Sequence, residues 1–405
     1  MIHLSKNELI LVGIVMLTMA VYFIIATPVM MDDGGHYEGF TESLAHGRLD
    51  FKSFYGFQGL SFFAVPVYWL TGSHISIIIT SAIFSLLSIP LAYLIGRDYH
   101  PAPNSSADHH KGAGLVRDFA SKKLRGNSTA GIYFMILILL TPYPYTTMMR
   151  GFQEAALLFF ILLIIYGSIH KRNWIPTIWA IGGIVKPFAL VLLPLFVSMS
   201  DLNPRKLVFG KIVWILVALA LGGLYLGASY YQTGHLVNNA AIGSYEDNFN
   251  TGNPPPLSSS FVVGVKGFIR VGANLLVHAR KILISPLVVI LGAVSLLFNK
   301  GLRLRQEFIF AIVLNFILVG SLTFSFSKYL LPMAILLALA AMPYLQKYRW
   351  FMALVFIDSL FVFLPIWNYF GNHFWNSVYI YFTPIYLSVA IYCYAIRSNN
   401  FNPNS

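Results

Sequence analysis

Apolar residues run through the chain in long stretches, separated by short polar segments that are rich in basic residues. The stretches cover residues 9–30, 73–96, 129–148, 152–169, 174–199, 212–231, 282–298, 308–326, 329–345, 350–366 and 379–396. Most have roughly 17 to 25 residues, which is the length that a helix needs to cross a bilayer. The pattern therefore predicts an all-α polytopic membrane protein with about 11–12 transmembrane or half-membrane helices.

Composition agrees with this prediction. Hydrophobic residues make up 57% of the chain and charged residues 10%, whereas a soluble globular protein carries roughly 25% charged residues. A chain with so few charges cannot cover a soluble surface, so a soluble enzyme and a disordered protein are excluded. A β-barrel is excluded because its strands alternate apolar and polar residues in short segments. The single cysteine, Cys393, rules out a disulfide scaffold and a cysteine-based metal site.

The net charge of +12 would suggest nucleic acid as a partner in a soluble protein. Here we expect no nucleic acid, because basic residues collect in the cytoplasmic loops of membrane proteins and beside anionic headgroups. The basic clusters lie at 170–172, 205–211, 300–305, 347–349 and 397. If every apolar stretch were one simple span, the cluster at 205–211 and all later clusters would face outward.

All the clusters face the cytoplasm if the stretch 174–199 enters the membrane and returns as two short half-helices. Lys186 followed by Pro187 marks the break, because proline disfavours helix at the preceding residue and removes a hydrogen bond from the ladder. Backbone that is not helical at this depth needs cover from protein or a water-filled cavity. We expect the turn near Lys186 to approach the outer side.

This threading makes residues 97–127 a cytoplasmic basic loop and places residues 31–72, 232–280 and 368–378 outside the membrane. Within the second outer loop, residues 261–281 have the pattern of an amphipathic interface helix. The first stretch resembles an uncleaved signal anchor. We interpret residues 1–405 as one integral-membrane domain of the plasma (inner) membrane, with no soluble C-terminal domain.

Two adjacent carboxylates, Asp32 and Asp33, follow the first apolar stretch on the predicted outer face. One carboxylate near a membrane surface can act as a general base toward a hydroxyl, and the other can orient it or hold a cation. The alternative is structural: both residues cap the next helix, and Gly34 and Gly35 form a turn. The acid pair alone leaves both interpretations open.

Further motifs carry a family resemblance. After the acid pair come His36 and Tyr37, then Ala45-His46-Gly47-Arg48, Phe54-Tyr55-Gly56 and Pro66-Val67-Tyr68-Trp69-Leu70-Thr71-Gly72. Downstream lie a glycine-rich run ending in Lys186-Pro187 and the segment Ser327-Lys328-Tyr329-Leu330-Leu331-Pro332. In this order the motifs resemble those of GT-C-fold glycosyltransferases, most closely the protein O-mannosyltransferase and lipid A aminoarabinose transferase group. Asp33 stands where that group usually has Glu, and His36 and Lys328 stand where Arg is common.

The resemblance implies an inverting enzyme that takes a sugar from a polyprenyl-phosphate carrier and passes it to an acceptor hydroxyl at the extracytoplasmic face. Asp32 would be the general base, with Asp33 beside it. Cations near the outer headgroups would stabilise the leaving lipid phosphate, and the candidates are Lys186, Lys328, Arg150 and Arg270. The expected substrate-binding residues are His36, Tyr37, Tyr55, Tyr329 and His373.

The same resemblance implies the partners. They are a polyprenyl-phosphate-linked sugar donor, an acceptor glycan, lipid or protein, and the membrane lipids. We expect that no cofactor is required. A divalent cation at Asp32 and Asp33 remains an alternative.

Several candidates also have a structural interpretation. Arg150 can pair with Glu154 four residues later on a helix, and Lys328 and Arg270 can reach ordinary lipid phosphates. Lys186 differs, because it lies inside an apolar stretch, where a cation is costly and usually functional.

Two other polar groups are expected to be structural. Asp358 lies in the middle of an apolar stretch, and we favour a hydrogen bond between helices over a proton relay. His109 and His110 follow Asp108 in the cytoplasmic loop without a further ligand set, so we favour a solvated loop over a metal site.

Three rival functions remain. A transporter or lipid flippase would suit a broken helix, although the chain has no obvious two-half repeat. An envelope polysaccharide polymerase or ligase also uses lipid-linked sugar, but such enzymes typically rely on Arg and His in outer loops. An inactive GT-C-like assembly partner is the third.

Overall fold

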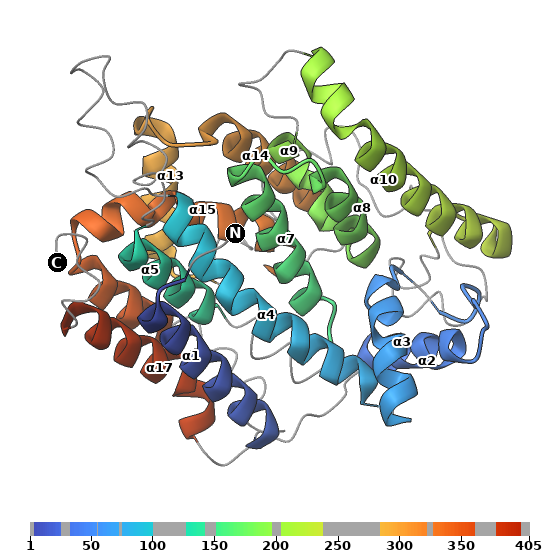
Figure 1. The fold of residues 1–405 in the computed structure, drawn as a ribbon, viewed down its shortest axis with the longest axis horizontal. Coiled ribbons are helices and arrows are strands. Elements are labelled where there is room, and N and C mark those ends of the chain that lie inside the picture. Colours follow the sequence, from blue (N-terminus) through green and yellow to red (C-terminus); the bar gives the residue numbers. More distant parts are fainter. Residues whose placement is uncertain are drawn as a thin grey trace.

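The structure, a computed structural model, describes residues 4–25, 33–54, 56–72, 75–99, 127–141, 151–196, 204–237, 284–321, 327–360 and 378–397. These residues form helices that pack side by side, and no strand occurs among them (Figure 1). The prediction of an all-α polytopic membrane fold is confirmed.

The α-helices follow the apolar stretches of the sequence. They are α1 (Lys6–Ile25), α4 (Ser76–Tyr99), α5 (Ser128–Leu139), α7 (Glu154–Ile169), α8 (Ile175–Val185), α9 (Leu193–Phe196), α10 (Pro204–Thr233), α13 (Pro286–Phe298), α14 (Arg305–Ser321), α15 (Leu331–Lys347) and α17 (Val378–Arg397). The segment that the sequence predicts as the first outer loop holds α2 (Asp33–Ala45) and α3 (Gly59–Thr71). Two short 3-10 helices are η2 (Pro187–Leu192) and η5 (Ser327–Leu330). A further helix covers Phe351–Leu360.

Three described segments are long and apolar enough to cross a membrane: Lys6–Ile25, Ser76–Tyr99 and Lys211–Thr233. The other apolar helices are shorter. Helices α5 and α15 are buried on nearly all sides, which is the behaviour of an all-apolar helix at the centre of a bundle. In contrast, α10 lies at one edge of the molecule with most of its apolar side chains exposed (Figure 1), as expected for a face toward lipid.

The predicted break in the stretch 174–199 is confirmed. Helix α8 ends at Val185, Lys186 is extended (φ −158°, ψ 128°), and η2 follows. The indole nitrogen of Trp179 donates a 3.1 Å hydrogen bond to the carbonyl of Leu190. Residues eleven apart in a continuous helix would be roughly 16 Å apart, so the chain turns back at Lys186. The returning half is a 3-10 helix followed by the single turn α9, and not a regular α-helix.

Two loop boundaries differ from the prediction. Helix α4 continues to Tyr99, so Arg97 and Asp98 are helical rather than part of the basic loop 97–127. Helix α10 continues to Thr233, so Gln232 is helical rather than the start of the outer loop 232–280. In both places the helix extends into polar sequence because its polar side chains find partners in other elements. The predicted interface helix at 261–281 and residues 368–378 lie outside the described residues.

Candidate active site

Helix α2 of the predicted first outer loop is attached to the start of α4 by Glu38. This side chain is 4% exposed. Its carboxylate accepts a 2.8 Å hydrogen bond from the Ser76 hydroxyl and a 3.0 Å hydrogen bond from the backbone N–H of Ile77. The N–H groups in the first turn of a helix have no intrahelical acceptor and carry partial positive charge. Glu38 therefore holds α2, which begins at Asp33, against a helix that can span the membrane.

Helix α3 rests directly on the end of α8. A Cβ atom on Gly59 would lie 2.5 Å from both Cα and the backbone nitrogen of Val185, so only glycine permits this approach. The hydroxyl of Ser61 donates a 2.8 Å hydrogen bond to the carbonyl of Tyr37, which ties α3 to α2. The two loop helices therefore form one unit that touches the broken helix beside Lys186.

At the break, Lys186 forms an ion pair with Glu154. The ammonium group donates a hydrogen bond to Oε1 of the carboxylate. The side chains are 12% and 2% exposed, respectively, so the pair is almost entirely removed from solvent. A lone buried charge in an apolar environment is very costly. Each residue therefore supplies the opposite charge that the other requires.

Tyr329 lies next to this pair. The Lys186 ammonium is 5.6 Å from the centre of its ring, within the range of a cation–π interaction. The ring stacks on Phe188, with centroids 4.3 Å apart and planes at 17°. Its backbone carbonyl accepts a 3.0 Å hydrogen bond from the amide of the fully buried Asn315. Residues from α7, the α8–η2 turn, η5 and α14 thus meet at one place.

No family model matches the chain, and no curated protein matches it. Two solved structures do, both of ArnT from Cupriavidus metallidurans. The apo crystal structure has a TM-score of 0.58 at 12% identity, and the alignment covers 95% of this chain and 70% of the ArnT chain. The crystal structure bound to undecaprenyl phosphate has a TM-score of 0.54 at 13% identity, and the alignment covers 96% of this chain and 70% of the ArnT chain. The chain has the GT-C fold of ArnT. The GT-C-like architecture expected from the loop motifs is confirmed, and at these identities the likeness concerns the fold.

Within this ArnT-like fold, the structure brings together only part of the predicted site. Lys186 and Tyr329 are in contact range. Tyr37 packs against the apolar cluster that contains Val185 and Ala155, the neighbours of the ion pair in sequence. His36 lies on α2 and is half-buried. The remaining predicted residues lie outside the described residues, either entirely (Asp32, Tyr55, Arg150, Arg270 and His373) or with their side chains (Asp33 and Lys328).

The structure decides one of the structural alternatives. Gly34 and Gly35 lie inside α2, so the prediction of a turn at these residues is wrong. The capping alternative stays open, because α2 begins at Asp33. The Glu154 carboxylate accepts a hydrogen bond from Lys186, and the suggested pairing of Glu154 with Arg150 stays a prediction because Arg150 lies outside the described residues. The sequence does not show which apolar stretches are neighbours in space, so the partner of a buried acid is visible only in the structure.

Sequence reasoning did not identify Glu154 or Glu38 as site residues. Glu154 could have been found, since an acid in the first turn of an all-apolar stretch needs a partner inside the bundle, and Lys186 is the basic residue in the adjoining apolar stretch. Glu38 gave no such signal, because it lies in a polar loop. Its partner is a helix N-terminus, which is visible only in the structure.

A divalent cation at Asp32 and Asp33 remains an untested alternative to the expectation that no metal is required. Among the residues that the structure describes, no group of three His, Cys, Asp or Glu side chains could hold a metal ion. Asp32 and the side chain of Asp33 are not among them.

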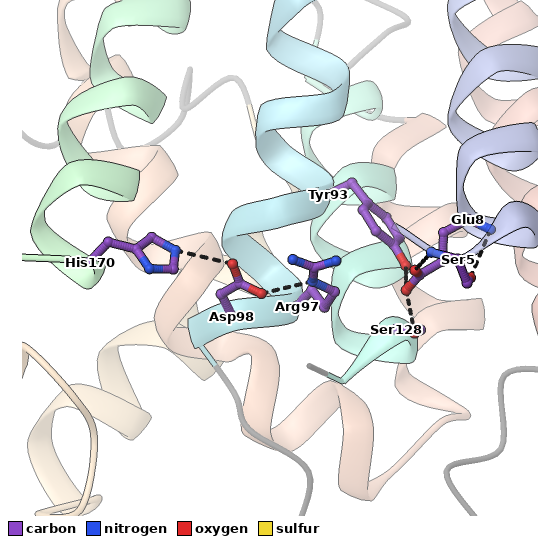
Figure 2. Close-up of polar contacts among 7 residues, drawn as sticks. All are labelled: Ser5, Glu8, Tyr93, Arg97, Asp98, Ser128 and His170. Carbon is purple, nitrogen blue, oxygen red and sulfur yellow. Dashed lines mark hydrogen bonds and ion pairs between the residues drawn. The ribbon is translucent and has the colours of Figure 1, made fainter. Parts of the chain in front are cut away.

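A second polar cluster lies at the opposite end of α4 and α7 (Figure 2). The Glu8 carboxylate accepts hydrogen bonds from the hydroxyls of Tyr93 (2.5 Å) and Ser128 (2.6 Å), which joins α1, α4 and α5. Asp98 pairs with Arg97 at 2.7 Å and with His170 at 3.1 Å, which joins α4 to the end of α7. Each of these side chains forms a hydrogen bond or ion pair with a residue of another helix or with the adjacent residue of its own helix. We therefore interpret this cluster as a structural connection between helices.

Asp358 fulfils the structural prediction. Its carboxylate accepts a 2.5 Å hydrogen bond from the Ser285 hydroxyl and a 3.0 Å hydrogen bond from the backbone N–H of Leu287. It thereby satisfies the first turn of α13 from another helix. The predicted hydrogen bond between helices is confirmed.

Proposed function

We propose that the protein is an integral-membrane glycosyltransferase that moves a sugar from a polyprenyl-phosphate carrier to an acceptor hydroxyl. The observation that carries this proposal is the buried Lys186–Glu154 pair at the break of a membrane helix, directly beside the first outer loop. The fold supports it, because it is that of ArnT, of which one crystal structure is bound to undecaprenyl phosphate.

In the proposed reaction the acceptor oxygen attacks the anomeric carbon from the face opposite the phosphate. Asp32 takes the hydroxyl proton as the new C–O bond forms, and the bond from carbon to the phosphate oxygen breaks with inversion. The polyprenyl phosphate leaves as an anion. Lys186 stabilises this anion with its positive charge and its N–H donors. A site shielded from water strengthens this interaction.

Glu154 has a positioning role in this proposal. It holds the Lys186 ammonium at the turn and offsets the cost of burying it. Lys328, Arg150 and Arg270 are the further proposed phosphate contacts. The proposed contacts to sugar and acceptor are His36, Tyr37, Tyr55, Tyr329 and His373. The reaction takes place at the extracytoplasmic face of the plasma membrane and requires no cofactor.

The test is transfer of radiolabelled sugar from a polyprenyl-phosphate sugar pool in membranes. Asp32→Asn should abolish transfer while donor binding is retained. Lys186→Met combined with Glu154→Gln should weaken binding of undecaprenyl phosphate while avoiding a lone buried carboxylate. Lys300→Met is the matched control, because Lys300 is an exposed lysine at a helix end, and it should behave like wild type. If the Asp32 and Lys186 variants both transfer sugar normally, the proposed site is wrong.

One observation keeps a second function in view. A discontinuous membrane helix with a buried ion pair at the break also suits a transporter or flippase. Wild-type protein that transfers sugar from no donor, yet moves a labelled polyprenyl-phosphate lipid across liposome membranes, would favour that reading over the transferase. Failure of both assays would favour an inactive assembly partner.

A further inference from the structure

Among the described residues, helix α10 contacts the segment between α2 and α3 near one of its ends. Most of its length is exposed apolar surface, apart from its packing on α8, where the Thr177 hydroxyl donates to the Trp214 carbonyl at 2.9 Å. Near its C-terminal end, however, α10 reaches the segment between α2 and α3 (Figure 1). This connecting segment, residues 49–58, contains no helix among its described residues.

Gln232 holds one end of the connecting segment. Its amide oxygen accepts a 2.8 Å hydrogen bond from the backbone N–H of Phe51, and its amide nitrogen donates a 2.5 Å hydrogen bond to the carbonyl of Leu49. The side-chain amide thus pairs with the backbone as a neighbouring strand would. Both backbone groups lie in a part of the chain that has no helical hydrogen-bond ladder to satisfy them.

Tyr225 holds the other end. Its hydroxyl accepts a 2.8 Å hydrogen bond from the backbone N–H of Gln58. Its ring meets Phe51 edge-on at 5.3 Å and stacks near Phe57 at 6.3 Å. The ring is buried in a cluster that includes Ile184, two residues before Lys186. Tyr225 therefore contributes both a polar anchor and an apolar one.

On its other side, the connecting segment is held by residues next to the ion pair, at the start of α7 and at the end of α8. The amide of Gln153 donates a hydrogen bond to the Phe57 carbonyl, and the next residue is Glu154, the partner of Lys186. Gly59 then rests on Val185. The end of the segment is therefore fixed between α10 and the Lys186–Glu154 pair.

We propose that Tyr225 and Gln232 are positioning residues that hold residues 49–54 and 56–58 closed against the ion pair, so that this part of the predicted first outer loop is assembled before the lipid phosphate binds. This inference rests on the proposed function, because it gives the closed segment a role in binding the donor. When the segment opens, the fraction of molecules that can bind falls, and the apparent affinity falls by the same factor.

The experiment uses the full-length protein in nanodiscs. Gln232→Leu removes both amide hydrogen bonds, and Tyr225→Phe removes the hydroxyl but keeps the ring. Gln232→Glu keeps the acceptor for Phe51 and loses the donor to Leu49, so it should rescue in part. Tyr231→Phe is the matched control, because Tyr231 is a tyrosine of the same helix that is 91% exposed.

Hydrogen exchange is the first readout. We expect the Phe51 amide to exchange about fivefold faster or more in Gln232→Leu, and the Gln58 amide to do so in Tyr225→Phe, since each loses its acceptor. Amides of α5 and α15 should keep their wild-type rates. Equal acceleration throughout the bundle would show general destabilisation and would overturn the inference.

The second readout separates KM from kcat in the sugar-transfer assay. We expect the donor KM to rise about fivefold for each hydrogen bond lost, with kcat within about twofold of wild type, and an intermediate KM for Gln232→Glu. An unchanged KM, or a loss confined to kcat, would overturn it. If wild type transfers no sugar, the proposed function fails, and the affinity for undecaprenyl phosphate replaces KM. Unchanged affinity in the variants would then overturn the inference independently.

Discussion

Breaking the Lys186–Glu154 pair should cost far more stability than replacing it. Both side chains are nearly buried, at 12% and 2% exposure, so Lys186→Met leaves a carboxylate with no opposite charge, and Glu154→Leu leaves an ammonium with none. Removing one partner of a buried pair typically costs about 3–5 kcal/mol, whereas replacing both with apolar residues is often neutral. We expect about 3 kcal/mol for each single variant and less than about 1 kcal/mol for the double variant. The cation–π contact with Tyr329 adds a smaller loss to Lys186→Met.

An SDS unfolding titration in mixed micelles measures these three free energies as a double-mutant cycle. Lys300→Met, at an exposed position, should change stability by less than about 0.5 kcal/mol. The double variant should keep its fold and still lose affinity for undecaprenyl phosphate, which separates the structural from the proposed functional role. Additive losses in the double variant would refute the pairing, and single losses below about 1 kcal/mol would refute its burial.

Three further predictions concern single positions and can be measured by the same titration. Gly59→Ala should destabilise by about 1–3 kcal/mol, because its Cβ would meet the backbone of Val185 at 2.5 Å, whereas Gly222→Ala, with nothing within 4 Å of its Cβ, should be neutral or slightly stabilising. Glu8→Ala should cost about 2 kcal/mol, since it leaves the hydroxyl donors of the buried Tyr93 and the half-buried Ser128 without their acceptor, and a cost near zero would contradict the connection in Figure 2. Asp358→Ala should cost about 1–2 kcal/mol by removing the cap on the first turn of α13; unchanged stability would contradict this.

The bundle could be predicted from the sequence because apolar length and proline chemistry act locally. The stretch ending at Phe298 became α13, and the break at Lys186 followed from the need to keep every basic cluster on one side. The proline at 187 supplied a local reason for the break, and the structure places it at that residue. Helix ends were less accurate, because Asp98 and Gln232 extend their helices through contacts with distant residues.

The candidate site could be predicted only in part, since its partners come from different helices. Lys186 stood out because a cation in an apolar stretch needs an explanation. Its partner did not, because Glu154 had a plausible local partner in Arg150 four residues earlier. Helix periodicity describes neighbours within one element. It does not show that the start of α7 and the end of α8 meet, because this contact depends on how the chain turns back after α8.

Four acids that lie buried or half-buried among the described residues share a feature that explains why so few charges are sufficient. Glu8, Glu38, Glu154 and Asp358 each accept hydrogen bonds from a different helix. Inside a membrane the lipid is as apolar as the helices, so burial of apolar surface does little to select one packing over another. A carboxylate with a donor on one particular neighbour does select. Three of these acids connect membrane helices to each other, while Glu38 connects the predicted outer loop to the bundle.

We therefore expect Glu38→Gln, which is isosteric but uncharged, to leave bundle stability within about 1 kcal/mol of wild type. Hydrogen exchange in α2 should nevertheless accelerate, and equal protection of α2 in the variant would contradict this division of roles.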